Sequence, residues 1–235
     1  MNTVPRTPAS KSPRTTPRAA RPPRGGARPG PGPAGRDTRA DIFLSAAEAF
    51  SARGFGGVGV DDIAREAGVN KAMIYYHFAD KLSLYRAIFA DMMREAGRRI
   101  TEAADSEGSA QVKLERFIAS FVGLAAERPW FPTLMMREVA EGAPHLDLET
   151  LGLMRVVFDA FGRILAGGEA EGRFRRVNPV LAYMSTLGPM LFNAARERAA
   201  RVPGRKALPM FVDVPREELT RHMQETVIRM LAKDR

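Results

Sequence analysis

Apolar residues recur at spacings of three and four along nearly the whole chain after residue 36. This is the period of an α-helix that buries one face. The first such helix is expected to be capped by Thr38 and to end at Gly54. Its apolar face consists of Ile42, Ala46, Ala49 and Phe50. No segment shows the sustained alternation of a strand, so the pattern predicts an all-α protein.

Two short helices joined by a tight turn follow at about residues 60–79. Gly68 ends the first of them at a position that favours a left-handed residue. Asn70 precedes the second and can accept hydrogen bonds from its free backbone N–H groups. This is a helix-turn-helix, whose second helix can enter the major groove of DNA. The chain from residue 37 onward is therefore predicted to begin with a DNA-binding domain, and the break at residues 104–110 is the candidate domain boundary.

The same periodicity predicts further helices after this motif. The helices lie at about residues 82–103, 111–128, 130–139, 148–165, 178–198 and 215–232. Gly167 and Gly168 are expected to end the helix that begins at residue 148. The helix at 178–198 is apolar almost all round up to Phe192, so it should be buried on several sides.

The second helix of the helix-turn-helix carries side chains that suit contacts with DNA. The candidates are Lys71, Ala72 and Met73 for base edges, and Tyr75, Tyr76, His77 and Lys81 for phosphate oxygens. The alternative is that the aromatic residues form the core of a small helical bundle. Because Tyr75 and Tyr76 are adjacent, they lie about 100° apart on a helix, and full burial of both is not expected.

Charge is distributed unevenly along the 235 residues. The chain has 36 Lys and Arg against 27 Asp and Glu, a net charge of +9. Residues 1–36 hold eight of the basic residues and no acidic one, so the rest of the chain carries only +1 (9 − 8). Nine prolines and five glycines in this segment predict a disordered basic tail. The tail either adds non-specific attraction to phosphates or has no effect on binding.

Composition excludes several classes of site. The absence of cysteine rules out disulfides and thiolate zinc sites. With three histidines a transition-metal sensor is not expected, although a carboxylate site stays open. The glycine-rich connector at 55–59 has no Gly-Lys-Ser/Thr sequence, so it is not a P-loop. No apolar run approaches the roughly 20 residues of a membrane-spanning helix. We therefore expect a cytoplasmic protein with no metal, no cofactor and no catalytic site.

A set of residues within 37–96 resembles the TetR/AcrR family of bacterial transcriptional regulators. The set comprises Ile42, Ala46–Ala47, Phe50, Gly54–Phe55, Asp62–Ile63–Ala64, Ala67–Gly68–Val69, Lys71, Tyr75–Tyr76–His77–Phe78 and Lys81. The resemblance implies that operator DNA is contacted by Asn70, Lys71, Ala72, Met73, Tyr75, Tyr76, His77 and Lys81. The chain departs from the family at Val58, Gly59 and Val60, where Ser or Thr is usual. It also has Met73 where Thr is frequent, so the operator sequence does not carry over.

The resemblance also implies a three-helix DNA-binding domain over residues 37–96 and a helical second domain over residues 97–235 that binds a small molecule and forms a homodimer. The dimer contacts would come from the last two long helices, 178–198 and 215–232. The apolar surface of 178–198 exceeds what one monomer's core requires, which agrees with this role. A dimer would read two half-sites roughly 34–36 Å apart on a palindromic operator.

Aromatic and methionine side chains are frequent between residues 111 and 176, and these types repack readily around apolar ligands. The candidate pocket residues are Phe117, Phe121, Trp130, Phe131, Met135, Met136, Met154, Phe158 and Phe161. The alternative is that they form an ordinary core. His145, with Glu138 or Glu141, could meet a polar group of the ligand, or His145 could simply lie in a surface loop.

These observations predict a ligand-responsive DNA-binding regulator, a repressor that a small apolar effector releases from double-stranded operator DNA. Two alternatives remain at this stage. One is a dimeric DNA-binding regulator that responds to no effector. The other is an enzyme built on a helical bundle, although no Ser/His/Asp grouping, metal-spaced histidine pair or nucleotide-binding loop is present.

Overall fold

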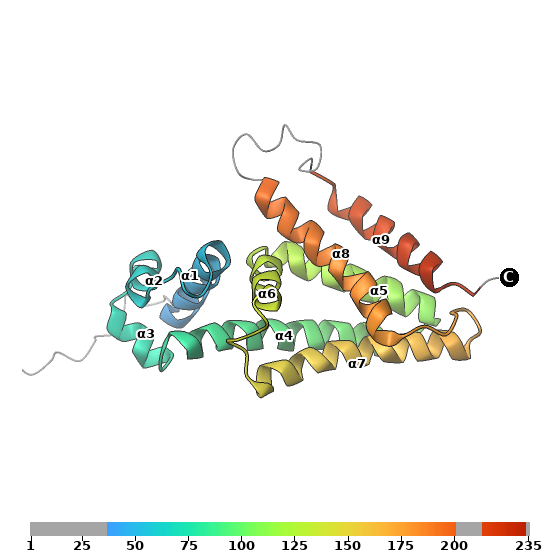
Figure 1. The fold of residues 1–235 in the computed structure, drawn as a ribbon, viewed down its shortest axis with the longest axis horizontal. Helices are drawn as coiled ribbons and strands as arrows, with labels where there is room; N and C mark the ends of the chain where they lie inside the picture. The colour runs from blue at the N-terminus through green and yellow to red at the C-terminus, as the bar shows by residue number, and fades with distance from the viewer. Residues whose placement is uncertain (1–36, 201–212, 234–235) are drawn as a thin grey trace, which may run out of the picture. The chain divides into compact units, whose positions relative to one another are not determined.

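The computed structural model describes residues 37–200 and 213–233, which fold almost entirely as helices (Figure 1). The helices are α1 (Thr38–Arg53), α2 (Val60–Ala67), α3 (Lys71–His77), α4 (Lys81–Asp105), α5 (Ala110–Glu127), α6 (Trp130–Ala140), α7 (Leu148–Ala170), α8 (Pro179–Ala200) and α9 (Arg216–Leu231). Within the described residues, extended pairing is confined to one isolated bridge between Phe174 and Ala232. The all-α prediction is confirmed. The predicted tail at 1–36 lies outside the described residues.

Helices α1 to α3 pack together around the start of α4, and short-range capping explains their boundaries. Gly68 adopts the left-handed conformation (φ 66°) that ends α2, as predicted. The side chain of Asn70 accepts a hydrogen bond from the Ala72 amide at 2.9 Å and starts α3, which is also as predicted. The predicted cap at Thr38 is wrong. Asp37 caps α1 instead, because its carboxylate accepts from the Ala40 amide at 3.0 Å.

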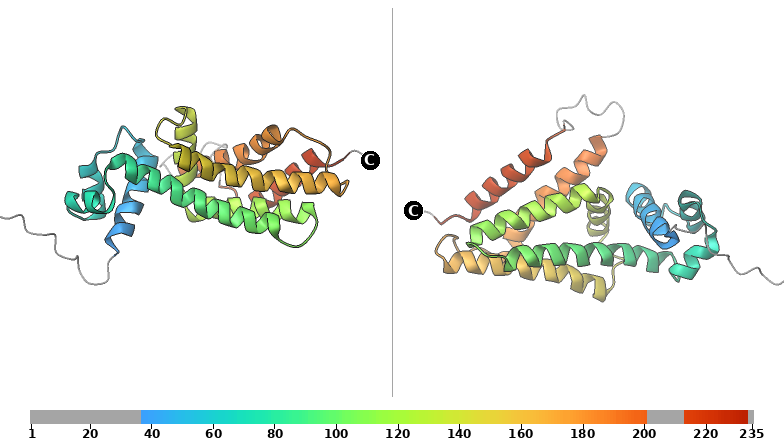
Figure 2. Two further views of the ribbon diagram at one scale, coloured as in Figure 1. Left: turned by 90° about the horizontal axis from the view of Figure 1, so that it is seen from below. Right: turned by 180° about the vertical axis from the view of Figure 1, so that it is seen from behind.

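Helix α4 extends from the helix-turn-helix into the rest of the fold. Asp80 caps it by accepting from the Ser83 amide at 2.7 Å. Along its length α4 packs chiefly against α7 and α5, and Figure 2 shows α4 and α7 side by side. Gly97 permits this approach, since a Cβ there would lie 3.3 Å from the Val156 side chain. The predicted boundary between residues 96 and 97 falls inside this helix and stays a prediction.

Helix α7 passes through the two glycines that were expected to end it. It continues to Ala170, and Gly168 lies directly under the Phe174 ring. Any Cβ on Gly168 would overlap that ring, so this glycine serves a close contact and does not end the helix. The chain turns two residues later at Gly172, whose φ is 70°.

Helix α8 begins as predicted, because the Asn178 side chain accepts from the Val180 amide at 2.9 Å. The expectation that it is buried on several sides fails for this single chain. One side of α8 packs on α5, α6, α7 and α9, while another side leaves large apolar residues exposed. The exposed residues, with relative accessibilities of 53–66%, are Val180, Leu181, Met184 and Phe192.

One continuous hydrophobic core runs from α1 through α4 to α9. Ile42, Ile74 and Phe89 are among its fully buried members. Within residues 37–200 and 213–233, no helix combines the length and the apolarity that a bilayer crossing requires.

Candidate nucleic-acid interface and effector cavity

The exposed face of α3 carries most of the side chains predicted to contact DNA. Tyr76 is 76% exposed and Tyr75 is 48% exposed, so neither belongs to the core. Asn70, Lys71 and Ala72 are exposed beside them. The core aromatic of this region is Phe78, which is buried. Helix α3 therefore presents a polar and aromatic surface while Ile74 and Phe78 fix it from behind.

Two of the predicted contact residues are only partly accessible. Met73 is half-buried and packs against the core. His77 is half-buried as well, with the Tyr76 ring edge-on at 5.0 Å. Its Nε2 atom is buried and has no hydrogen-bond partner among the described residues. These two side chains affect the shape of the surface, but they contribute little of its exposed area.

Lys71 is exposed and is held by an ion pair that DNA can replace. Its ammonium lies 2.9 Å from a carboxylate oxygen of Asp61 in α2. The hydrogen bond that Lys71 donates to Asp61 raises the pKa of Lys71 above its usual value. Because both side chains are largely exposed, the pair contributes little to stability and can exchange for a phosphate.

Lys81, predicted to contact a phosphate, directs its ammonium to carbonyl groups of the protein itself. Its Nζ donates to the carbonyl oxygens of Phe55 at 3.0 Å and Val58 at 3.1 Å. The same ammonium lies 4.1 Å from the centre of the Phe55 ring. Gly57 lies in this connector, and a Cβ there would overlap the Arg53 carbonyl oxygen. Lys81 thus fixes the glycine-rich connector that leads into the helix-turn-helix.

Replacing Lys81 with Met is expected to lower the free energy of unfolding by about 2 kcal/mol, because two carbonyls lose their donor and the ring loses its cation. Urea unfolding followed by circular dichroism measures this. The matched control is Lys71→Met, which loses one exposed ion pair and should stay within about 0.5 kcal/mol of the parent. Equal free energies of unfolding for the two variants would show that Lys81 does not stabilise the connector.

The start of α2 lacks the hydroxyl that usually caps such a helix. Gly59 is the N-cap, and Asp62 compensates by accepting from the Gly59 amide at 3.1 Å. Arg65 donates to the same carboxylate at 2.6 Å. The hydrogen bonds from Arg65 and then Gly59 hold the pKa of Asp62 below its usual value. The N-terminus of α2 therefore carries a negative side chain where a phosphate could otherwise bind.

The helix-turn-helix region is not basic overall. Residues 37–81 contain five Lys or Arg and seven Asp or Glu, a net charge of −2 (5 − 7). Attraction to the DNA backbone depends on positive charge near the phosphates. Residues 37–81 therefore offer little long-range attraction to phosphates.

A cavity of about 360 Å³ lies between α4, α5, α6, α7 and α8. Five of the nine predicted pocket residues line it, namely Phe121, Phe131, Met135, Met136 and Met154. The other four do not line it. The rings of Phe117 and Phe161 pack against each other with their centres 5.1 Å apart. The ring of Phe158 packs on that of Tyr183 with the centres 5.3 Å apart. Trp130 is buried beside Phe131.

Sequence reasoning missed the wall contributed by α4 and α8. These lining residues include Met93, Tyr183, Met184, Leu187 and Leu191. The pocket was predicted within residues 111–176, and the apolar surface of 178–198 was predicted to serve the core and the dimer contacts. The signal was present in the sequence, since a helix that is apolar almost all round can line a cavity and an interface at once.

A buried polar cluster lies between the cavity and the helix-turn-helix. Glu138 on α6 is 1% exposed and accepts from the Tyr85 hydroxyl at 2.7 Å and from the His145 amide at 2.8 Å. The His145 ring lies 3.1 Å from the same carboxylate and packs on the Phe55 ring at 4.2 Å. Burial, followed by the contact with Glu138, raises the pKa of Tyr85, which keeps its hydroxyl protonated. Glu138 and His145 contact each other and do not line the cavity.

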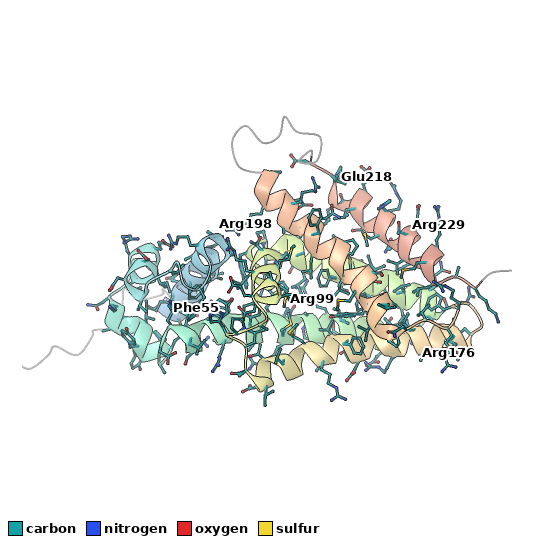
Figure 3. The ribbon with its side chains drawn as sticks, viewed as in Figure 1. Phe55, Arg99, Arg176, Arg198, Glu218 and Arg229 are labelled. Atoms are coloured by element: carbon teal, nitrogen blue, oxygen red, sulfur yellow. The ribbon has the colours of Figure 1, made fainter. Side chains whose placement is uncertain are left out.

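Two further contacts connect the cavity helices to α1. Arg137 on α6 donates to the carbonyl oxygens of Ser51 at 3.3 Å and Ala52 at 3.2 Å, which are free acceptors at the end of α1. Arg198 near the end of α8 lies 3.0 Å from Glu48. In Figure 3, Phe55 is labelled beside α1, α4 and α6, and Arg198 near the end of α8. Helices that line the cavity are therefore tied to the helix-turn-helix region by side-chain contacts.

Comparison with known proteins finds bacterial transcriptional regulators that match most of the chain. A family model described as bacterial regulatory proteins, tetR family, matches residues 42–88. A second model, described as tetracyclin repressor-like, C-terminal domain, matches residues 111–231. The HTH-type transcriptional regulator RutR of Escherichia coli is 25% identical over 138 residues, which cover 59% of this chain and 65% of RutR. The chain thus spans just under two thirds of this relative's length.

Other relatives match shorter regions or the fold alone. The HTH-type transcriptional regulator TtgR of Pseudomonas putida is 38% identical over 72 residues, 31% of this chain and 34% of TtgR. The structure of the ketosteroid transcriptional regulator KstR2 of Mycobacterium tuberculosis has a TM-score of 0.68 at 18% identity. That match covers 83% of this chain and 95% of the other. A tetR-family protein from Rhodococcus RHA1 has a TM-score of 0.69 at 20% identity, over 85% of this chain and 100% of the other.

Proposed function

Because the chain belongs to the tetR family of bacterial regulatory proteins, which are DNA-binding transcriptional regulators, we propose that it is a homodimeric repressor released from a palindromic operator by a small apolar effector. One observation carries this proposal. The helices that enclose the apolar cavity also hold the helix-turn-helix region through Arg137, Glu138 and Arg198. A ligand that moves these helices would therefore act on the DNA-reading surface.

The proposed contacts with DNA lie on the exposed face of α3. Lys71, Ala72 and Asn70 would meet base edges and nearby phosphates, while Tyr75 and Tyr76 would contact the backbone. Met73 and His77 would contribute through their accessible edges. Lys81 would act by positioning the connector, since two of its three N–H donors already bind carbonyl oxygens.

Replacing Tyr76 with Ala is expected to weaken DNA binding about tenfold, because an exposed aromatic contact at the DNA surface is lost. Fluorescence anisotropy with a duplex that the protein selects from a random library measures the change. The free energy of unfolding should stay within about 0.5 kcal/mol of the parent, since the side chain is outside the core. Tyr76→Phe separates the ring from the hydroxyl. Unchanged DNA affinity of the Tyr76→Ala variant would contradict the proposal that α3 contacts DNA.

The proposed dimer surface is the exposed apolar side of α8, together with α9. Val180, Leu181, Met184 and Phe192 are 53–66% exposed, and a group of large exposed apolar side chains on one helix favours an interaction surface. Burying this side against a second copy would place two α3 helices on one face of a DNA duplex. Operator half-sites would then lie roughly 34–36 Å apart.

Effector action is proposed as a population shift between two arrangements of the dimer. The ligand would bind one arrangement more tightly, and only this difference in affinity can change the affinity for DNA. Helix α6 would transmit the change, because one side of it lines the cavity and the other carries Arg137 and Glu138. Helix α4 offers a second route, since Met93 lines the cavity and Tyr85 binds Glu138.

Ligand-dependent release of a bound duplex tests the proposal. In anisotropy measurements, an effector should lower the affinity for DNA by about 5- to 150-fold, the usual range of coupling between two sites. Ligand that binds the dimer while the duplex stays bound would favour a regulator whose second domain only dimerises. The variant Ala96→Leu places a larger side chain in the cavity wall. It should bind DNA normally and no longer release it when the effector is added.

A further inference from the structure

We propose that the effector is a neutral, mainly apolar molecule with a carbonyl-type hydrogen-bond acceptor, and that the Tyr183 hydroxyl donates to this acceptor. The inference rests on the proposed function, in which the cavity is the effector site. It adds the chemistry of the ligand, which the family assignment does not supply. Three observations carry it: the wall of the cavity, the surroundings of Tyr183 and the protonation of its hydroxyl.

The cavity wall has no charged side chain among the described residues that line it. Hydrocarbon, aromatic and thioether groups form it, and five of the side chains are methionines: Met93, Met135, Met136, Met154 and Met184. A carboxylate or ammonium group placed against such a wall would lose its hydration and gain no partner. Methionine side chains can adapt to the outline of a ring or a chain. The wall therefore selects neutral, apolar ligands.

Tyr183 contributes the one conventional hydrogen-bonding side chain among the described residues of this wall. Its ring is held edge-on by Phe158 at 5.3 Å and by Phe161 at 5.7 Å. The side chain is half-buried, and its hydroxyl has no hydrogen-bond partner within residues 37–200 and 213–233 and is not among their fully buried polar atoms. Because packing already fixes the ring, a ligand that binds the hydroxyl orders little additional side-chain freedom.

The protonation state of Tyr183 decides which partner it prefers. Burial raises the pKa of Tyr183 to about 12, so the hydroxyl is protonated and neutral at physiological pH. A ligand that covered the hydroxyl without offering an acceptor would leave this donor unsatisfied, at a cost of about 1–3 kcal/mol, and an acceptor on the ligand avoids that cost. The carbonyl oxygen of a ketone, ester or amide meets this requirement without bringing a charge into the cavity.

The size of the cavity suits one small molecule. Its volume of about 360 Å³ lies at the lower end of the roughly 300–1,000 Å³ range of ligand pockets. Exposed side chains at the rim, Met136 and Val139 among them, extend the apolar surface outward from the cavity. A compact ring system or a short chain with its carbonyl near Tyr183 fits this arrangement.

Three probes of nearly equal shape test the proposal by isothermal titration calorimetry on the full chain. They are the ketone acetylnaphthalene, the carboxylate naphthoate and the hydrocarbon ethylnaphthalene, each substituted at the same ring carbon. The ketone should bind about tenfold more tightly than either of the other two. Tyr183→Phe should weaken the ketone about tenfold and leave ethylnaphthalene within about twofold, since the ring and its packing are kept.

The controls separate this inference from the proposed function. Thermal unfolding of Tyr183→Phe should match the parent, which excludes loss of the cavity as a cause. Naphthoate that binds as tightly as the ketone, or a ketone affinity unchanged by Tyr183→Phe, would overturn the inference even if these ligands release DNA. A ketone that binds through Tyr183 and leaves the duplex bound would support the inference and overturn the proposed function.

Discussion

Deletion of residues 1–36 is expected to lower the affinity for duplex DNA by about 10- to 100-fold at roughly 50 mM salt, and by much less at high salt. The physical reason is the distribution of charge. The segment holds eight Lys or Arg and no acidic residue, whereas residues 37–81 carry a net charge of −2. We therefore expect most of the long-range attraction to phosphates to come from the N-terminal segment, and counterion release is the part of binding that salt suppresses.

The measurement is the slope of the logarithm of the binding constant against the logarithm of salt concentration. Each phosphate contact that is lost should reduce the steepness of this slope by roughly 0.9. A matched control keeps the full length and replaces the eight basic residues with Gln, and it should behave like the deletion. The sequence preference should be unchanged in both variants, because α3, the proposed reading helix, is left intact. An unchanged slope would show that the segment takes no part in binding.

The features that the sequence predicted well are those decided by neighbouring residues. Gly68 and Asn70 end and begin their helices through contacts within two to four positions, so their residue types were sufficient. Helical periodicity located every described helix because one face of each is buried in the core. Asp37 was missed as a cap because two possible caps are adjacent, and only the geometry chooses between them.

The features that the sequence did not predict depend on residues far apart in the chain. Lys81 binds carbonyls 26 and 23 positions away, and Tyr85 binds Glu138 at a separation of 53. Lysine and tyrosine are also common on protein surfaces, so the neighbouring sequence does not reveal that these two side chains have distant partners. Gly168 was taken as the end of a helix because its contact is with Phe174, and a close approach has the same local signature as a stop.

The candidate cavity shows the same limit. Residue type identified aromatic and methionine side chains between 111 and 176, but it could not separate those that face the cavity from those that pack behind it. Phe121 and Phe117 lie on the same helix one turn apart, yet only Phe121 lines the cavity. Tyr183, the side chain with the most informative chemistry, lies outside the interval that composition selected.

Replacing Glu138 with Ala is expected to lower the free energy of unfolding by about 3 kcal/mol, because the buried Tyr85 hydroxyl and the His145 amide both lose their acceptor. For a chain of this size, that corresponds to a fall of roughly 6–12 °C in Tm. The stability should be measured by urea unfolding and by calorimetry. Glu141→Ala is the matched control, since it removes an exposed carboxylate at the end of the same helix and should cost less than about 0.5 kcal/mol.

The same substitution separates structure from signalling. Glu138 joins α6 to Tyr85 on α4 and, through His145, to the Phe55 connector. At a temperature where the variant is fully folded, it should still bind acetylnaphthalene, because Glu138 does not line the cavity. Release of the duplex by that ligand should become weaker, since movement of α6 would no longer reach the connector.

A double-mutant cycle with Tyr85→Phe should give a coupling energy of about 1–3 kcal/mol. A Glu138 variant as stable and as responsive as the Glu141 control would show that this buried cluster neither holds the fold together nor transmits the signal.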